Sequence, residues 1–168
     1  MRAMCFTLIM SVFVAACAVR LPQLDSFIGN DAAEMDLSPY YWTFSADGER
    51  YELLAISLPN KTMFADKESR FVSFDGWMIN EVAGFSGNNS SISISQAGNS
   101  FSVLTGGQAI ANYTCDAWVK NSHRQGAQFV QSCSHGYEST IDIDADGNIT
   151  RIHQFDGLHE WVLEKNNI

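Results

Sequence analysis

The sequence predicts an all-β domain, an antiparallel meander of about ten short strands that forms a sandwich or a barrel. Short runs in which apolar and polar residues alternate recur at intervals of roughly 8–12 residues, as in the Ser-Ile-Ser-Ile-Ser run of residues 91–95. Turn-forming pairs such as Asp47-Gly48 and Gly106-Gly107 separate these runs. No long segment repeats its apolar residues with the period of an amphipathic helix.

The predicted strands are bounded by residues that interrupt a sheet. An aromatic and β-branched run at residues 40–44 comes first, and the run at 50–58 follows the Asp47-Gly48 turn. Pro59 and the pair Asp75-Gly76 end two of the next strands. The later runs include residues 129–133, 137–143, 149–155 and 159–163.

Residues 1–16 are predicted to be an export signal. Arg2 supplies the positive charge, and residues 5–14 are apolar but too short to cross a bilayer core of about 30 Å as a helix. Residues 17–38 show little periodicity and are predicted to be a tether, so that residues 39–168 form a single β domain.

The end of the export signal resembles the lipobox of bacterial lipoproteins. The run is Val14-Ala15-Ala16-Cys17. In that family the signal peptidase cuts before the cysteine and its thiol receives a diacylglycerol, which implies a lipid anchor on Cys17. Ala18, by resemblance to enterobacterial sorting signals, favours the periplasmic face of the outer membrane. The alternative is an ordinary secretory signal followed by a coincidental cysteine.

Two cysteines remain after Cys5 is removed and Cys17 is acylated. An exported protein with one remaining pair most often joins it, so a disulfide is predicted between Cys115 and Cys133. A zinc site that adds His123 and His135 is an alternative, although their spacing matches no familiar zinc pattern.

The charge of the chain excludes one class of partner. The chain holds 10 basic and 19 acidic residues and a net charge of −9, with the acids scattered along it. Nucleic-acid binding needs a basic stripe to neutralise phosphates, and the sequence has none. An evenly acidic surface is typical of a soluble domain.

Three aspartates form a candidate calcium site. Asp142, Asp144 and Asp146, with Gly147, resemble the front of an EF-hand calcium loop, but the position of the bidentate glutamate is His153. The flanking residues alternate as strands do, so a β-hairpin turn is favoured over calcium. No cofactor is predicted.

The tryptophans are the candidates for contact with a glycan. Trp42, Trp77, Trp118 and Trp161 lie in or beside predicted strands, where packing in the core is the default for an aromatic ring. One or two of them could line an open groove and stack on sugar rings. No Gly-x-Ser-x-Gly elbow occurs, and no residue is assigned a catalytic role, so the protein is predicted not to be an enzyme.

Two stretches resemble one family. They are residues 70–84 (RFVSFDGWMINEVAG) and 137–155 (YESTIDIDADGNITRIHQF). In this order behind a lipobox they resemble the YjbF/GfcB lipoproteins of exopolysaccharide and group 4 capsule operons. The resemblance implies a mostly antiparallel, non-catalytic, outer-membrane-associated protein that assists polysaccharide export or assembly by binding polysaccharide or export-machinery proteins. The Cys115 and Cys133 pair is not part of that family's pattern.

A second resemblance gives an alternative function. Tyr113-Thr114-Cys115-Asp116 resembles the start of lipoprotein inhibitors of c-type lysozyme, which are small disulfide-tied barrels. The loop that such inhibitors need is matched poorly by Ser134-His135-Gly136-Tyr137. An envelope hydrolase is the remaining alternative.

Overall fold

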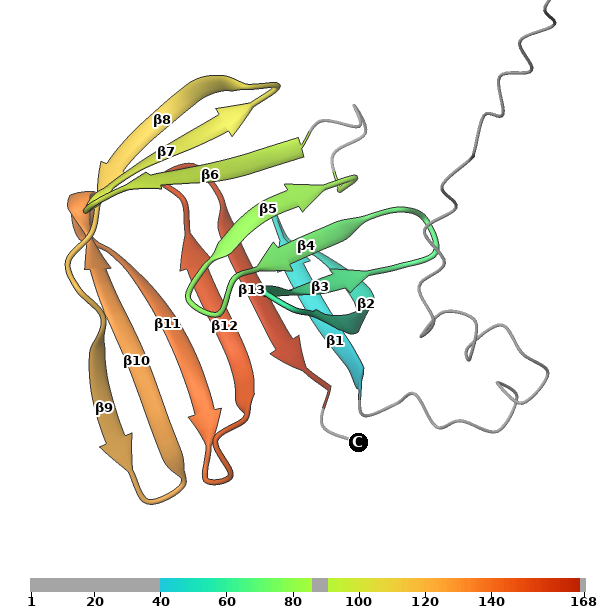
Figure 1. Ribbon diagram of the computed structural model, residues 1–168, viewed down its shortest axis with the longest axis vertical. Helices are drawn as coiled ribbons and strands as arrows, with labels where there is room; N and C mark the ends of the chain where they lie inside the picture. Colours follow the sequence, from blue (N-terminus) through green and yellow to red (C-terminus); the bar gives the residue numbers. More distant parts are fainter. Residues whose placement is uncertain (1–39, 86–90, 167–168) are drawn as a thin grey trace, which may run out of the picture. The chain divides into compact units, whose positions relative to one another are not determined.

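The structure is a computed structural model that describes residues 40–85 and 91–166. Its strands form one antiparallel sheet, shown in Figure 1, which confirms the prediction of an all-β fold. The sheet has 13 strands, so the predicted number of about ten is too low. The export signal, Cys17 and the tether all lie outside the described residues.

Most of the strands are joined by short turns, and one turn of 3-10 helix, η3 (Ser134–Gly136), precedes β11. Their bounds are β1 Tyr41–Ala46, β2 Glu49–Leu58, β3 Lys61–Ala65, β4 Phe71–Phe74, β5 Ile79–Ala83, β6 Ser91–Ala97, β7 Ser100–Thr105, β8 Gln108–Thr114, β9 Val119–His123, β10 Gly126–Cys133, β11 Tyr137–Asp144, β12 Ile149–Phe155 and β13 Glu160–Lys165.

The order of the strands is a meander with one crossover. The order is β8-β7-β6-β5-β4-β3-β2-β1-β13-β12-β11-β10-β9. The described chain therefore starts in the middle of the sheet, runs outward to β8, crosses to β9 at the opposite edge and returns to β13, which pairs with β1. Apart from this last pairing, each strand pairs only with its neighbours in the sequence.

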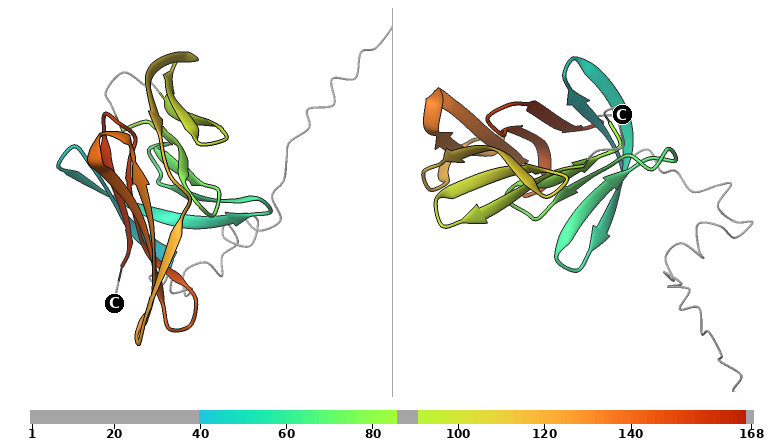
Figure 2. Two further views of the ribbon diagram at one scale, coloured as in Figure 1. Left: turned by 90° about the vertical axis from the view of Figure 1, so that its left-hand side faces the viewer. Right: turned by 90° about the horizontal axis from the view of Figure 1, so that it is seen from above.

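The sheet curls around its core, so that strands distant in the order come to face one another (Figure 2). The side chain of Gln154 in β12 hydrogen-bonds to the backbone of Ile79 in β5, although these two strands are not neighbours in the sheet. An isolated bridge between Cys115 and Cys133 joins the segment after β8 to the end of β10. The crossover is thereby attached to the half of the sheet that it enters.

Alternation of burial explains why these residues form strands. Trp42 and Phe44 of β1 are buried and their neighbours are more exposed, and Trp161 and Leu163 of β13 repeat the pattern. These side chains belong to a single hydrophobic core. The hairpin between β1 and β2 needs positive φ at both central residues, which an Asp-Gly pair supplies: φ is 52° at Asp47 and 84° at Gly48.

Strand β9 was not predicted from the sequence. All five of its residues are exposed. Because neither face of this edge strand is buried, nothing requires its side chains to alternate between apolar and polar, and the pattern by which the other strands were predicted is missing.

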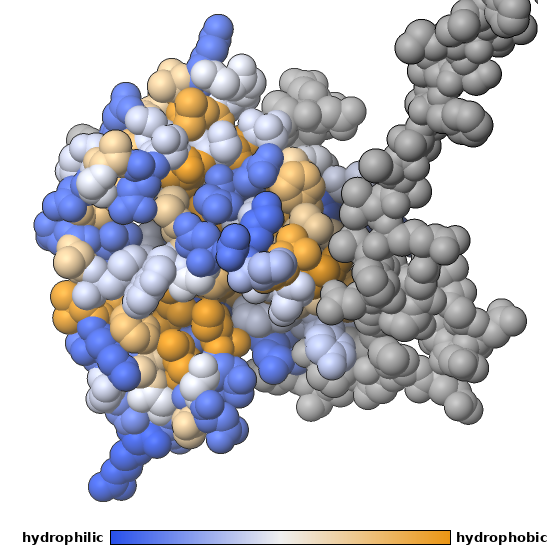
Figure 3. All heavy atoms as spheres, viewed as in Figure 1, coloured by the Kyte–Doolittle hydropathy of each residue, from blue (hydrophilic) through white to orange (hydrophobic). Residues whose placement is uncertain are grey.

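Several large hydrophobic side chains are exposed at the surface. Figure 3 shows hydrophobic residues interspersed with hydrophilic ones on the face that it presents. The large apolar side chains with the greatest exposure include Trp77, Val119 and Leu158. In residues 40–85 and 91–166, no helix is long and apolar enough to cross a membrane.

Candidate functional site

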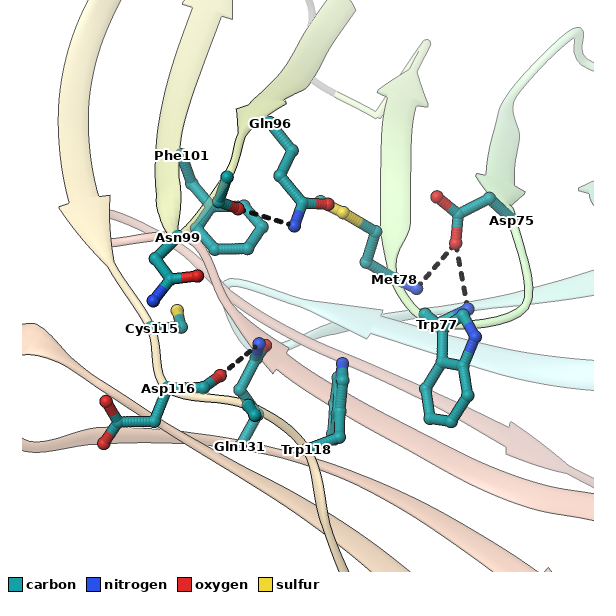
Figure 4. Close-up of a pocket in the computed structure, with 12 residues that line it drawn as sticks. Asp75, Trp77, Met78, Gln96, Asn99, Phe101, Cys115, Asp116, Trp118 and Gln131 are labelled. Atoms are coloured by element: carbon teal, nitrogen blue, oxygen red, sulfur yellow. Dashed lines mark hydrogen bonds between the residues drawn. The ribbon is translucent and has the colours of Figure 1, made fainter.

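A pocket of about 370 Å³ opens where three segments of the sheet meet (Figure 4). The segments are the turn between β4 and β5, the turn between β6 and β7, and the crossover after β8 together with β10. Its lining residues are Asp75, Trp77, Met78, Gln96, Gly98, Asn99, Phe101, Cys115, Asp116, Ala117, Trp118 and Gln131.

The floor of the pocket is apolar and continuous with the hydrophobic core. Met78, Phe101 and Cys115 are buried members of the core. Phe101 stacks on Tyr113, with ring centroids 5.1 Å apart and an interplanar angle of 10°. Burial, assisted by the negative charge of Asp156, raises the pKa of Tyr113 above its ordinary value of 10.0. The phenol of Tyr113, already neutral at physiological pH at its ordinary pKa, thus keeps its proton to a still higher pH.

Two tryptophans form one wall of the pocket. The Trp77 side chain is 51% exposed. Its ring centroid lies 5.9 Å from that of Trp118, with a tilt of 38° between the rings. Phe129 packs against Trp77 edge-on at 5.4 Å. The two indoles thus contact each other, and one of them offers a large accessible surface to a ligand.

Asp75 fixes the position of Trp77. Its Oδ1 atom accepts hydrogen bonds from the backbone N–H groups of Trp77 and Met78, each at 2.9 Å. A carboxylate that receives backbone N–H groups of the next residues stabilises a tight turn. This local structure sends Met78 into the floor and leaves the indole of Trp77 at the rim, as Figure 4 shows.

Amide side chains form the remaining polar walls. Gln96 Nε2 donates to the carbonyl of Gly98 at 3.0 Å, and Gln131 Nε2 donates to the carbonyl of Asp116 at 2.9 Å. These bonds fix the orientation of both amides, because only the NH₂ group can donate to a carbonyl. The Oε1 atom of each glutamine is then left to accept a hydrogen bond from a ligand.

The predicted disulfide between Cys115 and Cys133 is present, with an S–S distance of 2.06 Å. Backbone hydrogen bonds extend the attachment on either side: Cys115 N–H donates to Asn99 at 3.0 Å and Asp116 N–H donates to Ser132 at 2.8 Å. The disulfide therefore holds the crossover against both β10 and the β6–β7 turn. Cysteines joined in this way are not zinc ligands, so the alternative zinc site at this pair is wrong.

The four candidate tryptophans separate into two groups. Trp42 and Trp161 are 8% and 1% exposed and belong to the core, so a ligand in solution cannot stack on them. Trp77 and Trp118 lie side by side in the pocket wall. In the structure Trp42 and Trp161 lie inside strands β1 and β13, whereas Trp77 and Trp118 lie in the segments that precede β5 and β9.

Asp142 and Asp144, two of the three candidate calcium ligands, accept hydrogen bonds from neighbouring residues of the sheet and the turn. Asp144 Oδ1 accepts hydrogen bonds from the backbone of Asp146 at 2.9 Å and of Asn148 at 2.8 Å, and Asp142 Oδ1 accepts one from Gln128 at 2.8 Å. The bonds from Asn148 and Asp146 lower the pKa of Asp144. The described residues hold no group of three or more His, Cys, Asp or Glu side chains that could bind a metal ion. The segment is a hairpin turn between β11 and β12.

The polar residues of the pocket were missed by sequence reasoning. Asp75, Gln96, Asn99 and Asp116 stand in turns or beside them, and Gln131 stands within β10. Such residues are common in turns for reasons of backbone geometry, so their type carries no sign of a binding role. The pairing of strands brings them together, and no spacing in the sequence reveals it.

A smaller cavity of about 190 Å³ lies beside the β1–β2 hairpin. His159 lines it, and its Nδ1 atom is 2.9 Å from a carboxylate oxygen of the fully buried Asp156. An imidazole held by a carboxylate is part of many hydrolytic sites. No serine, threonine or cysteine stands among the described residues that line this cavity, so it offers that dyad no nucleophile.

Comparison of the chain with models of known protein families found no match, and a search of curated proteins found none.

Proposed function

We propose that the protein is a non-catalytic glycan-binding domain, anchored by a lipid on Cys17 to the periplasmic face of the bacterial outer membrane, that assists the export or assembly of an exopolysaccharide or capsule. The resemblance of residues 70–84 and 137–155 to the YjbF/GfcB lipoproteins supports the setting. The observation that supports glycan binding is the pair formed by Trp77 and Trp118 in the wall of an open, polar-rimmed pocket.

The chemistry of the pocket suits a sugar ring. A pyranose has an apolar C–H face and an equatorial rim of hydroxyl groups, and an indole presents a large apolar surface with a polar edge. The exposed Trp77 ring can cover the apolar face, while Asp75, Gln96 and Gln131 accept hydrogen bonds from hydroxyl groups. A concave site with an apolar lining and a few placed polar groups is the common form of a small-ligand site, and its volume is within the usual range of roughly 300–1,000 Å³.

Calorimetric titration of the purified full-length protein with neutral oligosaccharides tests this function. Trp77→Ala should weaken the binding of an oligosaccharide that the unaltered protein recognises by about threefold to tenfold, the effect of one aromatic contact. Trp118→Ala should weaken it as well, since this ring supports that of Trp77.

Trp42→Phe is the matched control, because Trp42 lies in the core and packs against Phe64. It should lower thermal stability and leave the affinity unchanged. If neither Trp77→Ala nor Trp118→Ala changes the affinity for the oligosaccharide, the assignment of the site is wrong. Inhibition of c-type lysozyme by the same preparations would favour the inhibitor alternative instead.

A further inference from the structure

We propose that this pocket selects glycans with free amino groups, such as units of glucosamine that lack the N-acetyl group, over anionic glycans. The inference rests on the proposed glycan-binding function and specifies the class of ligand. Three features of the pocket support it: the sign of its charges, the fixed position of one carboxylate, and a cation that already lies against the same aromatic cluster.

The formal charges of the pocket are all negative. Asp75 and Asp116 are the charged side chains among its described lining residues, which include no lysine, arginine or histidine. A uronate or phosphate group entering the pocket would meet like charges, and an ammonium group would meet opposite ones. Discrimination of this kind depends on repulsion of the wrong ligand as much as on attraction of the right one.

Asp75 is the carboxylate that is best placed to bind an ammonium group. Two backbone N–H groups hold its Oδ1 atom, so the side chain loses little further freedom when a ligand binds. Among the described residues, its Oδ2 atom takes part in no hydrogen bond. Figure 4 shows this carboxylate in the same turn as the indole of Trp77.

The other polar walls offer acceptors of the kind that an ammonium group needs. The amide nitrogens of Gln96 and Gln131 are directed to backbone carbonyls, which leaves their Oε1 atoms as acceptors. An ammonium group has three N–H donors and no acceptor, whereas an N-acetyl group has only one donor and adds an acceptor. The free amine therefore matches these walls better than its acetylated form.

The aromatic cluster already holds one cation. Lys120 Nζ lies 5.7 Å from the centre of the Phe129 ring, and Phe129 packs edge-on against Trp77. Rings attract cations through the negative potential of their faces, and an indole does so more strongly than a phenyl ring. Because Lys120 would repel a second cation, binding of an ammonium group at the half-exposed ring of Trp77 depends on the counter-charge of Asp75.

The test is calorimetric titration of the full-length protein with three tetrasaccharides: the tetramer of glucosamine, the tetramer of N-acetylglucosamine and the tetramer of galacturonic acid. The glucosamine tetramer should bind about threefold to tenfold more tightly than the acetylated tetramer, and the galacturonate tetramer most weakly. The preference for the amine should shrink as salt is added, since exposed charges are screened.

Asp75→Asn is the informative variant. Asparagine keeps an oxygen that can accept the backbone N–H groups of Trp77 and Met78, so the turn persists while the charge is removed. The ratio of the two affinities should fall to about one, because the amino tetramer loses its counter-charge and is weakened more than the acetylated tetramer, which loses one hydrogen-bond acceptor. Asp146→Asn is the control for general acidity, because it removes one charge from an exposed hairpin outside the pocket and should leave the ratio unchanged.

The outcomes separate this inference from the function on which it rests. Equal affinity for the amine and its acetylated form, or an equal loss of preference in Asp75→Asn and Asp146→Asn, would overturn the selectivity and leave glycan binding in place. If neither the acetylated nor the amino tetramer binds the unaltered protein, the proposed function of the pocket and its selectivity are both overturned. The same holds if Trp77→Ala binds the tetramers as tightly as the unaltered protein does.

Discussion

The side-chain amide of Gln154 pairs with the backbone of Ile79 as a neighbouring strand would. Its Oε1 atom accepts the N–H of Ile79 at 2.7 Å, and its Nε2 atom donates to the carbonyl of Ile79 at 2.9 Å. Gln154 is 4% exposed and Ile79 is fully buried. This pair links β12 to β5 across the core, two strands that are not neighbours in the sheet. It therefore helps to fix the curl of the sheet.

Gln154→Met should lower the free energy of unfolding by about 2–4 kcal/mol, because methionine fills a similar volume but leaves the N–H and carbonyl of Ile79 buried without partners. Urea denaturation followed by circular dichroism measures the loss. Gln108→Met, at an exposed position of β8, is the matched control and should change the stability by less than about 0.5 kcal/mol. Equal effects of the two substitutions would show that the Gln154 bonds contribute nothing to the curled sheet.

The disulfide makes a second long connection that can be tested separately. It closes a loop between residues 18 positions apart, and loops of this length are stabilised by about 3 kcal/mol in the chain-entropy model. The double variant Cys115→Ala with Cys133→Ala should lose about that amount in urea denaturation. Adding a reductant should destabilise the unaltered protein and leave the double variant unchanged. A double variant as stable as the unaltered protein would contradict this contribution.

The strands could be predicted because most of them bury one face. In β13, Trp161 and Leu163 are buried and Glu160 is exposed, so the sequence carries the period of two that a half-buried strand requires. In β9 no face is buried, so its sequence lacks this alternation and does not predict a strand. The curl of the sheet is also hidden, since nothing near Gln154 in the sequence indicates that its partner is a backbone 75 residues away.

The candidate site could be predicted only in part. The tryptophans were singled out by residue type, but strand pairing decides which of them reach the surface. Trp42 points from β1 into the core, whereas Trp77 lies in the turn before β5, at the rim of the pocket. The disulfide could be predicted from the number of cysteines together with the predicted export signal. Its place at the pocket could not, because that depends on where the crossover between the two halves of the sheet meets β10.

Asp66 should make the stability depend on acid pH. Burial alone would raise the pKa of this carboxyl, but hydrogen bonds from the side chain and backbone of Arg70 and from the backbone of Glu68 hold the pKa below its ordinary value of 3.8. A folded-state pKa below the unfolded one means that the unfolded chain binds more protons, so stability rises with pH in this range. The contribution is present above pH 3.8 and is lost as the pH falls through the lowered pKa.

Asp66→Asn tests this pH dependence. At neutral pH the variant should be less stable than the unaltered protein by about 1 kcal/mol, since it loses the ion pair with Arg70 on the surface of the β3–β4 turn. The gap should narrow as the pH falls below 3.8 and close below the lowered pKa, where Asp66 of the folded unaltered protein is also neutral. Urea denaturation between acid and neutral pH measures it. If the difference in the free energy of unfolding between the two proteins stays constant down to the lowest pH measured, the proposed role of this carboxylate is wrong.

Acylation of Cys17 is the prediction on which the location of the protein depends. Residues 5–14 are too short to anchor the chain as a spanning helix, whereas two or more acyl chains on one cysteine give a stable membrane attachment. Mass spectrometry of the protein from its native host should find Cys17 as the first residue, with a diacylglycerol on its thiol. Cys17→Ser should abolish this modification and release the protein from the detergent phase, while Cys5→Ser, inside the predicted export signal, should change neither. An unmodified thiol at Cys17, or cleavage at another position, would remove the lipid anchor and leave the glycan-binding pocket to be judged on its own titrations.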